Sequence, residues 1–363
     1  MNRRTFMIAN KNIPFAFLAL SVFYLRFLLN PELDGNVNYT IKKNIPDSKN
    51  LGRFRMRRLQ YELIKNKYFY GFMNQEYFSF DLENKSRREK QEYVGGWERM
   101  YYLDSVSSAE TQEKFNNKYL CSRIFDKYYK RDVAEIRSKD DFGNFLLFIA
   151  EHKRFMVKPE AFSLGVGIRI VDVDEFDDVV KLFADIIKNG CVVLEELVMQ
   201  SESMAAYHSE SVNTIRFVTA YNNGRTEYVY ALLRMGVSDS VVDNVYSGGI
   251  VAQVDTETGR VVTPGFRRED GAFVTFDRHP DTDAQITDST IPRWGELLDT
   301  INELVGVVPE QKYVGWDMAL TDDGWVMIEG NAKPSFGSIQ VCTGKGFRSK
   351  FEHIKDFLAE TNN

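Results

Sequence analysis

The sequence is poor in the residues that build disulfide frameworks, zinc sites and histidine-based active sites. Its 363 residues include only three cysteines and four histidines, all widely spaced. No CxxC, HExxH or GxSxG motif occurs, which argues against a structural zinc site, a zinc hydrolase and a histidine-activated nucleophile. Scattered cysteines without such spacing are typical of a reducing compartment.

Internal repeats and low-complexity linkers are absent as well, and a hydrophobic content of 44% indicates a globular protein. The length allows two or three modules with a real core.

Charge, however, is unevenly distributed along the chain. Residues 1–67 contain thirteen Lys/Arg and four Asp/Glu, which gives a net charge of +9. The remaining chain contains 33 Lys/Arg and 48 Asp/Glu, which gives a net charge of −15. A basic N-terminal segment often marks an anionic partner, such as a membrane surface or a polyanion.

One long apolar run, IPFAFLALSVFYLRFLL at Ile13–Leu29, is close to membrane-spanning length but contains Pro14 and Arg26. Basic residues precede it, as in a signal peptide, yet no small-residue cleavage site follows. Three interpretations stay open: a helix buried against the rest of the protein, an interfacial helix, and a transmembrane span.

The sequence pattern changes twice along the chain. Residues 1–45 form the basic and apolar N-terminal segment, and residues 46–116 have Phe, Tyr and Leu at helical spacing, which predicts a mainly helical domain. From residue 117 to residue 355, runs such as FMVK, CVVLEELV and VNTIRFVTAY alternate with helical patterns. The clearest helices are predicted at Asp174–Asn189 and Trp294–Val305. This alternation of strand-like runs with helical segments predicts an α+β fold with mostly antiparallel strands.

The stretch GWDMALTDDGWVMIEGN reads as a β-hairpin that carries Asp317, Glu329 and Asn331. A two-residue Asp-Gly loop would place Asp317 opposite Gly330. A three-residue loop with Gly324 in the left-handed conformation would place Asp317 directly opposite Glu329, with Asn331 on the same face. The opposite face would then be a core face, consisting of Trp316, Met318, Leu320, Val326 and Ile328.

Two carboxylates directly opposite each other repel, and a divalent cation between them reverses the sign of the interaction. Magnesium prefers oxygen ligands, commonly one or two carboxylates together with substrate phosphates. An acidic surface hairpin without a metal is the alternative interpretation of the same residues.

Two further segments suggest contacts with a phosphorylated ligand. Lys158 closes a strand before a loop with Ser163, Gly165 and Gly167, whose backbone amides could approach phosphate oxygens, although an ordinary hairpin is the alternative. The loop matches neither the Walker A nor the Rossmann pattern. Arg216 in NTIR and Arg234 carry the donor fork suited to phosphate, or form surface ion pairs.

CVVLEELV runs from a buried strand into two acids, and Glu195 can belong to a cap, a solvated pair or a linker that binds adenine. Glu202 follows at a distance that suits a ribose hydroxyl, with a surface position as the alternative.

The chain resembles the ATP-grasp superfamily over about residues 60–350. The motifs that carry this resemblance are, in order, Lys118, Lys158-Pro159 with its glycine loop, LEELV, NTIR, DN…GGI and GWD…IEGN. The sequence looks most like the sugar-transfer-associated ATP-grasp proteins found with bacterial polysaccharide biosynthesis. The resemblance implies two α+β lobes, residues 117–200 and 201–355, that clasp a nucleotide beside a mostly helical N-terminal region.

The resemblance also implies roles for individual residues. Lys118 and Lys158 would bind the phosphates or the adenine side, and the Ser163–Gly167 loop would close over the triphosphate. The remaining implied contacts are Glu195, Leu197 and Val198 with adenine, Glu202 with ribose, Asp317, Glu329 and Asn331 with magnesium, and Arg216 or Arg234 with the transferring phosphoryl group. The sequence departs from the family pattern near Glu202, because MQSESMAAYHSES intervenes where many ATP-grasp ligases carry the ribose-binding acid. The implied cofactors are ATP and two Mg²⁺ ions, with Mn²⁺ as a substitute.

The expected activity is that of a carboxylate–amine ligase that works through an acyl phosphate, or one that uses a thiol or hydroxyl in place of the amine. By resemblance, the carboxylate belongs to a uronic acid or peptide linked to a surface-polysaccharide precursor, such as a capsule precursor. A phosphotransferase acting on a sugar hydroxyl and a non-catalytic nucleotide-binding module are the alternatives. We expect a cytoplasmic bacterial protein that touches the inner face of the membrane through residues 1–67 and has no nucleic-acid partner. The sequence specifies neither the substrates nor the oligomeric state.

Overall fold

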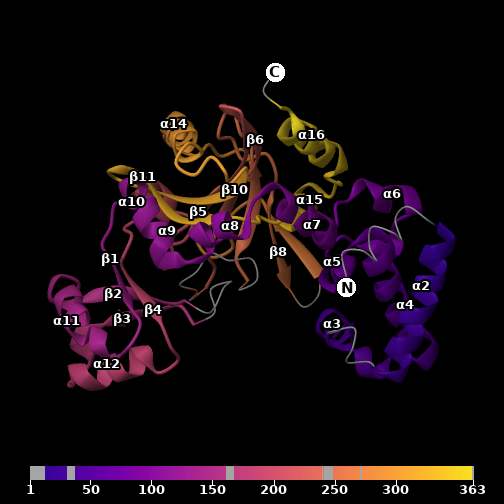
Figure 1. Ribbon diagram of the computed structural model, residues 1–363, viewed down its shortest axis with the longest axis horizontal. Coiled ribbons are helices and arrows are strands. Elements are labelled where there is room, and N and C mark those ends of the chain that lie inside the picture. Colours follow the sequence, from indigo (N-terminus) through magenta and orange to yellow (C-terminus); the bar gives the residue numbers. More distant parts are fainter. Residues whose placement is uncertain are drawn as a thin grey trace. The chain divides into compact units, whose positions relative to one another are not determined.

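The computed structural model describes residues 13–30, 37–160, 167–238, 240, 248–269 and 272–361 (Figure 1). The fold is of the predicted α+β type. It divides into two compact units. The helical unit contains Met1–Val106, Arg268–Val274 and Ser335–Asn363, and the sheet unit contains Ser107–Arg267 and Thr275–Pro334.

The helical unit is built from the predicted aromatic-rich helices and the C-terminal end of the chain. Its α-helices are α2 (Ile13–Leu29), α3 (Val37–Asn44), α4 (Arg53–Tyr70), α5 (Asn74–Ser79), α6 (Arg87–Glu92), α7 (Gly96–Val106), α15 (Gly337–Thr343) and α16 (Arg348–Ala359). Short 3₁₀ turns cover Ser48–Asn50 and Leu82–Asn84. Leu59, Leu63 and Ile64 of α4 are fully buried in its core.

Helix α2 coincides with the apolar run Ile13–Leu29. Leu20 and Phe27 are buried, and Phe23 stacks on Tyr68 of α4 with ring centroids 4.0 Å apart. The exposed side of the helix carries a stripe of apolar residues, Leu18, Val22, Leu25 and Leu29. Among the described residues, no helix combines the length and the apolar character needed to cross a membrane.

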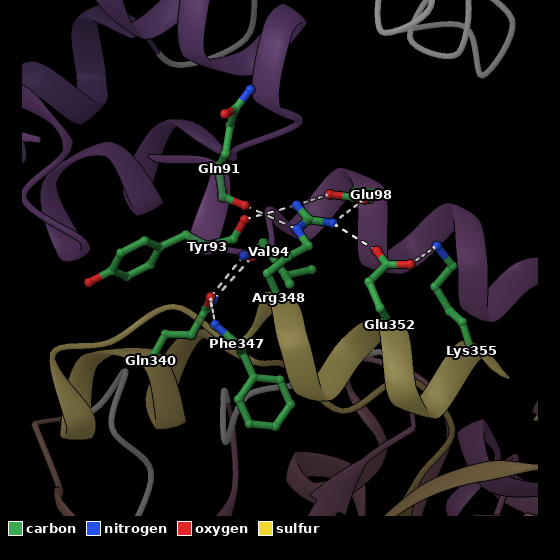
Figure 2. Close-up of polar contacts among 9 residues, drawn as sticks. All are labelled: Gln91, Tyr93, Val94, Glu98, Gln340, Phe347, Arg348, Glu352 and Lys355. Atoms are coloured by element: carbon green, nitrogen blue, oxygen red, sulfur yellow. Dashed lines mark hydrogen bonds and ion pairs between the residues drawn. The ribbon is translucent and has the colours of Figure 1, made fainter. Parts of the chain in front are cut away.

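The C-terminal helices are fixed to α6 and α7 through Arg348 and Gln340 (Figure 2). Arg348 forms a two-pronged ion pair with Glu98, at 2.6 and 2.7 Å, and also donates to the carbonyls of Gln91 and Tyr93. The buried Gln340 side chain exchanges two hydrogen bonds with the backbone of Val94. Segments about 250 residues apart in the sequence therefore form one helical unit.

Within the described residues, the sheet unit contains a four-stranded antiparallel sheet of order β1-β4-β2-β3. Its strands are β1 (Val133–Ile136), β2 (Arg154–Pro159), β3 (Arg169–Asp172) and β4 (Val192–Glu196). Helices α11 (Phe142–Glu151) and α12 (Val179–Ile187) bury apolar side chains against it. Helix α12 is shorter than the predicted Asp174–Asn189, because Val173–Glu175 forms a separate 3₁₀ turn and Asp178 caps α12 by accepting from Val180 and Lys181.

A larger sheet of described strands has the order β11-β10-β5-β6-β7-β8-β9 (Figure 1). Its strands are β5 (Thr214–Asn222), β6 (Arg225–Met235), β7 (Ile250–Val254), β8 (Gly265–Glu269), β9 (Ala272–Phe276), β10 (Tyr313–Thr321) and β11 (Gly324–Asn331). Helices of the same part of the chain are α8 (Ala109–Asn116), α9 (Lys118–Ile124), α10 (Asp126–Tyr129), α13 (Glu202–Ala205) and α14 (Trp294–Leu304), the last ending one residue before the prediction.

Strands β10 and β11 form the predicted hairpin, but neither predicted loop is correct. Asp322 and Asp323 alone make the loop, because Thr321 pairs with Gly324, whose φ is +114°. Asp317 nevertheless lies opposite Glu329, because a β-bulge between Asp317 and Met318 adds Ile328 to the facing strand.

Because of this bulge, the core face of β11 differs from the predicted one. Met327 pairs with Met318 and Trp325 pairs with Leu320, and all four belong to one core cluster. Val326 and Ile328 were predicted on this face, and that prediction is wrong. An extra residue in one strand reverses the alternation of its side chains relative to the partner strand.

Candidate functional site

The register of three neighbouring strands brings the predicted arginine and the two predicted acids into one row. Arg216 on β5 pairs directly with Asp317 on β10, and Asp317 pairs with Glu329 on β11. Directly opposed residues point to the same side of a sheet. Arg234 on β6 lies opposite Thr214, two residues from Arg216, so its side chain is on that side too.

Asp317 is held by both arginines. The Arg216 guanidinium donates from Nε to Oδ1 and from Nη2 to Oδ2, the latter at 2.7 Å, and Arg234 Nη1 donates to Oδ2 at 2.8 Å. The Asp317 side chain is 3% exposed. Burial alone would raise its pKa, but the two guanidinium groups outweigh burial and hold the pKa well below its ordinary value. Asp317 is therefore ionised at neutral pH.

Glu329 is the accessible acid of the site, with its side chain 49% exposed. Asn331 donates from Nδ2 to Glu329 Oε1 at 3.0 Å, and Arg216 Nη2 lies 3.8 Å from the same oxygen. The pKa of Glu329 is raised, because surrounding protein displaces water and Asp317 repels the charged form. The structure thus brings the three predicted metal ligands together.

The donor set fits a hard divalent cation, since it offers two carboxylates and an amide oxygen. The arginine bonds do not exhaust Asp317, because a carboxylate has about four acceptor positions. The two arginines and two acids have no net charge, so the repulsion expected between the acids is already offset in the protein itself. The ligand roles of these residues stay predictions.

Gly315 on β10 leaves space for the Arg216 side chain beside the row of Arg216, Asp317 and Glu329. A Cβ at Gly315 would lie 2.8 Å from Pro334 Cβ and 3.2 Å from Arg216 Cδ. Any larger residue would therefore push against the arginine that holds Asp317.

A second polar cluster lies on the four-stranded sheet around Glu195, which was predicted to contact adenine. Lys158 Nζ of β2 contacts Glu195 Oε2 at 2.8 Å, and Arg131 Nη2 contacts the same oxygen at 2.7 Å. Burial would raise the Glu195 pKa, but Lys158 and Arg131 lower it to about 2. Sequence reasoning had placed Lys158 and Glu195 in separate segments, and the structure makes them one buried ion cluster.

Arg131 was missed by the sequence analysis and connects the two sheets. Beyond its ion pair with Glu195, it donates to the carbonyls of Met327 at 2.6 Å and Ile328 at 3.2 Å on β11. Its guanidinium also lies over the Tyr129 ring, 4.3 Å from the centroid. The only signal in the sequence was a charged Lys-Arg-Asp step directly before β1, which is common at solvent-exposed junctions.

The other predicted nucleotide contacts are dispersed around this cluster. Lys118 Nζ donates to the carbonyls of Pro159 and Glu160 at the end of β2. Leu197 and Val198 follow β4, and within the described residues their backbone groups enter no hydrogen bond. Glu202 is exposed at the start of α13. Gly167 has a φ of +77°, whereas Ser163 and Gly165 lie outside the described residues.

Asn213 of the NTIR motif has a structural position on the other side of β5. It is fully buried, donates to the carbonyls of Met204 and His208 and accepts from the Gly236 amide. These bonds satisfy backbone groups of the segment before β5, and so they fix where that strand begins.

Comparisons with known proteins fit this arrangement. The sequence profile described as sugar-transfer associated ATP-grasp matches residues 98–356. No curated protein matches the chain significantly.

Solved structures with a similar fold include D-alanyl-alanine synthetase A from Vibrio cholerae, with 13% identity and a TM-score of 0.44 over 70% of this chain and 68% of that one. D-alanine–D-alanine ligase from Bacillus anthracis shows 14% identity and a TM-score of 0.41 over 71% of this chain and 73% of that one. A RiPP-associated ATP-grasp ligase from Chryseobacterium gregarium shows 13% identity and a TM-score of 0.42 over 73% of this chain and 68% of that one.

The profile match extends over well more than half of the chain and includes the Lys158–Glu195 cluster and the row of Arg216, Asp317 and Glu329. The chain therefore belongs to the sugar-transfer associated ATP-grasp family.

Proposed function

We propose that the protein is an ATP- and magnesium-dependent ligase that activates a carboxylate as an acyl phosphate and transfers the acyl group to an amine. The observation that carries this proposal is the row of Arg216, Asp317 and Glu329, with Arg234 on the same side of the sheet. It combines oxygen ligands for a metal with guanidinium groups for a phosphoryl group, inside a family whose name refers to ATP.

Glu329 and Asp317 would hold the magnesium, and Asn331 would add its amide oxygen to one of two ions. The metal, once bound with ATP, would neutralise phosphate oxygens and polarise the γ-phosphorus. Arg216 and Arg234 already lie beside these acids, and the ionised Asp317 orients both guanidinium groups. Their positions are fixed before the substrate arrives, which is the condition for electrostatic stabilisation of a transition state.

On the four-stranded sheet, the buried Glu195 would orient Lys158 toward the nucleotide phosphates, with Lys118 nearby at the end of β2. The backbone groups of Leu197 and Val198, which bond to none of the described residues, would bind the adenine edge, and Glu202 would reach the ribose. Gly167, together with Ser163 and Gly165, would belong to the loop over the triphosphate. These assignments support an ATP site between the two sheets.

The proposed chemistry has two steps. A carboxylate oxygen of the substrate attacks the γ-phosphorus, and the bond to the β,γ-bridging oxygen breaks, giving ADP and an acyl phosphate. The amine nitrogen then attacks the acyl carbon and phosphate leaves with its bridging oxygen, while the amine loses a proton. Arg216 and Arg234 would stabilise the negative charge on the phosphoryl group in both steps.

The proposed substrate class is a uronic acid, or a peptide carboxylate, linked to a surface-polysaccharide precursor such as a capsule precursor. The family description, with its reference to sugar transfer, supports this class. An amine is the first choice of nucleophile, and a thiol or hydroxyl would use the same acyl phosphate.

Trapping with hydroxylamine tests the reaction type. Purified protein with ATP, Mg²⁺, hydroxylamine and a panel of uronic acids and amino acids should give ADP, phosphate and a hydroxamate in equal amounts. Glu329→Gln should abolish all three products together. Its matched control, Glu310→Gln, changes an exposed acid that belongs to neither polar cluster and should leave all three products unchanged.

A phosphorylated sugar without free phosphate or hydroxamate would replace the ligase by a phosphotransferase. ATP binding with no turnover on any carboxylate or hydroxyl of the panel would favour a nucleotide-binding module.

Residues 1–67 are further proposed to contact the anionic inner face of a bacterial membrane. The exposed stripe of α2, Leu18, Val22, Leu25 and Leu29, offers apolar side chains. The surplus of nine positive charges in the same segment is complementary to anionic lipid headgroups.

A further inference from the structure

The helical unit contains a cavity of about 260 Å³ that the proposed ligase reaction does not use. Charged and aromatic side chains of α4, α5, α6 and the segments between them line it. They are Arg58, Glu62, Lys65, Tyr70, Tyr77, Glu83, Lys85, Arg87 and Lys90. The lining therefore has five cationic and two acidic side chains, a surplus of three positive charges.

Both acids of the lining already have ion-pair partners. Glu83 is paired with Arg55, which lies outside the lining, through a bond of 2.7 Å from Nη2. Glu62 is paired with Lys65 at 3.0 Å. Within the described part of the chain, Arg58, Arg87 and Lys90 have no ion pair. The described residues thus bring five cationic groups together here with only two acids.

Lys90 is the member of the lining for which this arrangement is most costly. The residue is only 7% exposed, although it carries an ammonium group. Burial lowers its pKa, and the attraction of Glu62 and Glu83 does not compensate. A buried charge without a partner is destabilising, and an anion bound in the cavity would supply the partner that Lys90 lacks among the described residues.

Tyr77 gives a second, independent indication. The residue is 2% exposed and lines the cavity, yet its hydroxyl has no hydrogen-bond partner among the described residues. Buried hydroxyl groups nearly always have a partner. The hydroxyl has almost no accessible surface of its own, so a ligand oxygen becomes its partner only if the lining shifts slightly on binding.

We propose that this cavity binds the phosphate or diphosphate group of a ligand, at a site separate from the proposed ATP site. A phosphomonoester or diphosphate carries two or three negative charges, which matches the surplus of the lining better than the single charge of a carboxylate. The guanidinium forks of Arg58 and Arg87 are suited to phosphate oxygens, and Lys90 would contribute a buried point charge. The site lies wholly within the helical unit and does not depend on the ligase assignment.

Calorimetry with inorganic pyrophosphate tests the proposal on the full chain. The titration is done with saturating non-hydrolysable ATP analogue, so that the proposed nucleotide site is filled. Wild type should bind pyrophosphate, and both Lys90→Met and Arg58→Gln should weaken binding at least tenfold. Arg57→Gln is the matched control, because Arg57 is an exposed neighbour on α4 that does not line the cavity.

Thermal unfolding separates loss of the site from loss of the fold. Lys90→Met keeps the length of the side chain but removes the buried charge, so without ligand its Tm should equal or exceed that of wild type. Pyrophosphate should raise the Tm of wild type and of Arg57→Gln, but not that of Lys90→Met. Equal binding by wild type and Lys90→Met would overturn the proposal.

A vesicle-binding experiment tests whether the phosphate group belongs to a lipid headgroup or to a soluble ligand. Vesicles with a phosphomonoester lipid are compared with vesicles of equal charge density made from a phosphodiester lipid. Preference for the phosphomonoester that is lost in Arg58→Gln and Lys90→Met would assign the site to a lipid headgroup, even if soluble pyrophosphate binds weakly. No dependence on these two residues in either arm would overturn the site altogether.

Discussion

At the scale of single residues, Asp317 and Glu329 face each other but have different physical situations. Asp317 is buried between two guanidinium groups, whereas Glu329 is half-exposed, accepts a hydrogen bond from Asn331 and lies 3.8 Å from Arg216. The same change of charge should therefore have different effects on stability at the two positions.

Asp317→Asn should lower the free energy of unfolding by roughly 3 kcal/mol, because it leaves two buried arginines without their counter-ion. Glu329→Gln should change it by less than about 1 kcal/mol, since exposed ion pairs contribute little. Urea denaturation at pH 7 measures both, and turnover should be lost in both variants. Equal destabilisation by the two changes would contradict the different roles derived from burial.

Glu195 predicts a pH dependence of stability. Its folded-state pKa of about 2 lies below the ordinary 4.5, so its ion cluster stabilises the fold fully above pH 4.5 and loses this effect as the pH falls toward 2. The shift corresponds to roughly 3 kcal/mol at pH 7. Asp317 adds to the same acid sensitivity, because its pKa is lowered as well.

Urea unfolding at pH 7, 4 and 3 checks this pH dependence. Glu195→Gln should be less stable than wild type at pH 7, and the difference should shrink at pH 3. The exposed Glu310→Gln should follow the wild-type curve at every pH. A constant difference between Glu195→Gln and wild type would show that charge on Glu195 does not stabilise the fold.

At the scale of elements, the hairpin depends on Gly324. Its φ of +114° is strained for any residue with a side chain, and an added Cβ would lie 3.2 Å from Arg293 Nη2. Gly324→Ala should destabilise the protein by about 1–2 kcal/mol. Gly143→Ala in helix α11, where nothing lies within 4 Å of the added carbon, should instead stabilise it by about 0.5–1 kcal/mol. Thermal denaturation of both variants measures the contrast, and destabilisation by both would contradict it.

The stripe on α2 predicts vesicle binding that can be removed without unfolding the protein. Replacing Leu18, Val22 and Leu25 by serine should abolish cosedimentation with anionic vesicles, because the lost side chains are exposed and apolar. Circular dichroism should stay unchanged.

The matched control for the α2 variant replaces Leu147 and Val180, which are equally exposed on helices of the sheet unit. The control should bind vesicles like wild type, and salt should weaken that binding. Unfolding of the α2 variant would indicate that the stripe belongs to the core instead.

At the scale of the whole molecule, the C-terminal helices complete the helical unit although the whole sheet unit intervenes in the sequence. Arg348→Met removes the bonds to Glu98 and to the Gln91 and Tyr93 carbonyls. Hydrogen exchange of α16 should become at least tenfold faster, because Arg348 is the first residue of the helix and its bonds fix that end to α6 and α7. Lys355→Ala, which removes only an ion pair to Glu352, should leave the exchange rate of α16 within twofold of wild type.

Much of the architecture is readable from the sequence, because helical spacing, strand alternation and turn residues act over a few neighbours. The helices of the N-terminal region, the α+β class of the fold and the hairpin that carries Asp317 and Glu329 follow from such patterns. So does the family, since its motifs occur in order along the chain.

The rest depends on which distant segments pair, and local patterns contain no information on that. The bulge at Ile328 decides the core face of β11, and Arg216 reaches Asp317 across 101 positions of sequence. Arg131 joins Glu195 to β11 only because both sheets pack beside it. The order of residues specifies which chemical groups are present and where they occur along the chain. Which charges are buried together depends on the folded structure, because desolvation and Coulomb energy depend on three-dimensional neighbours.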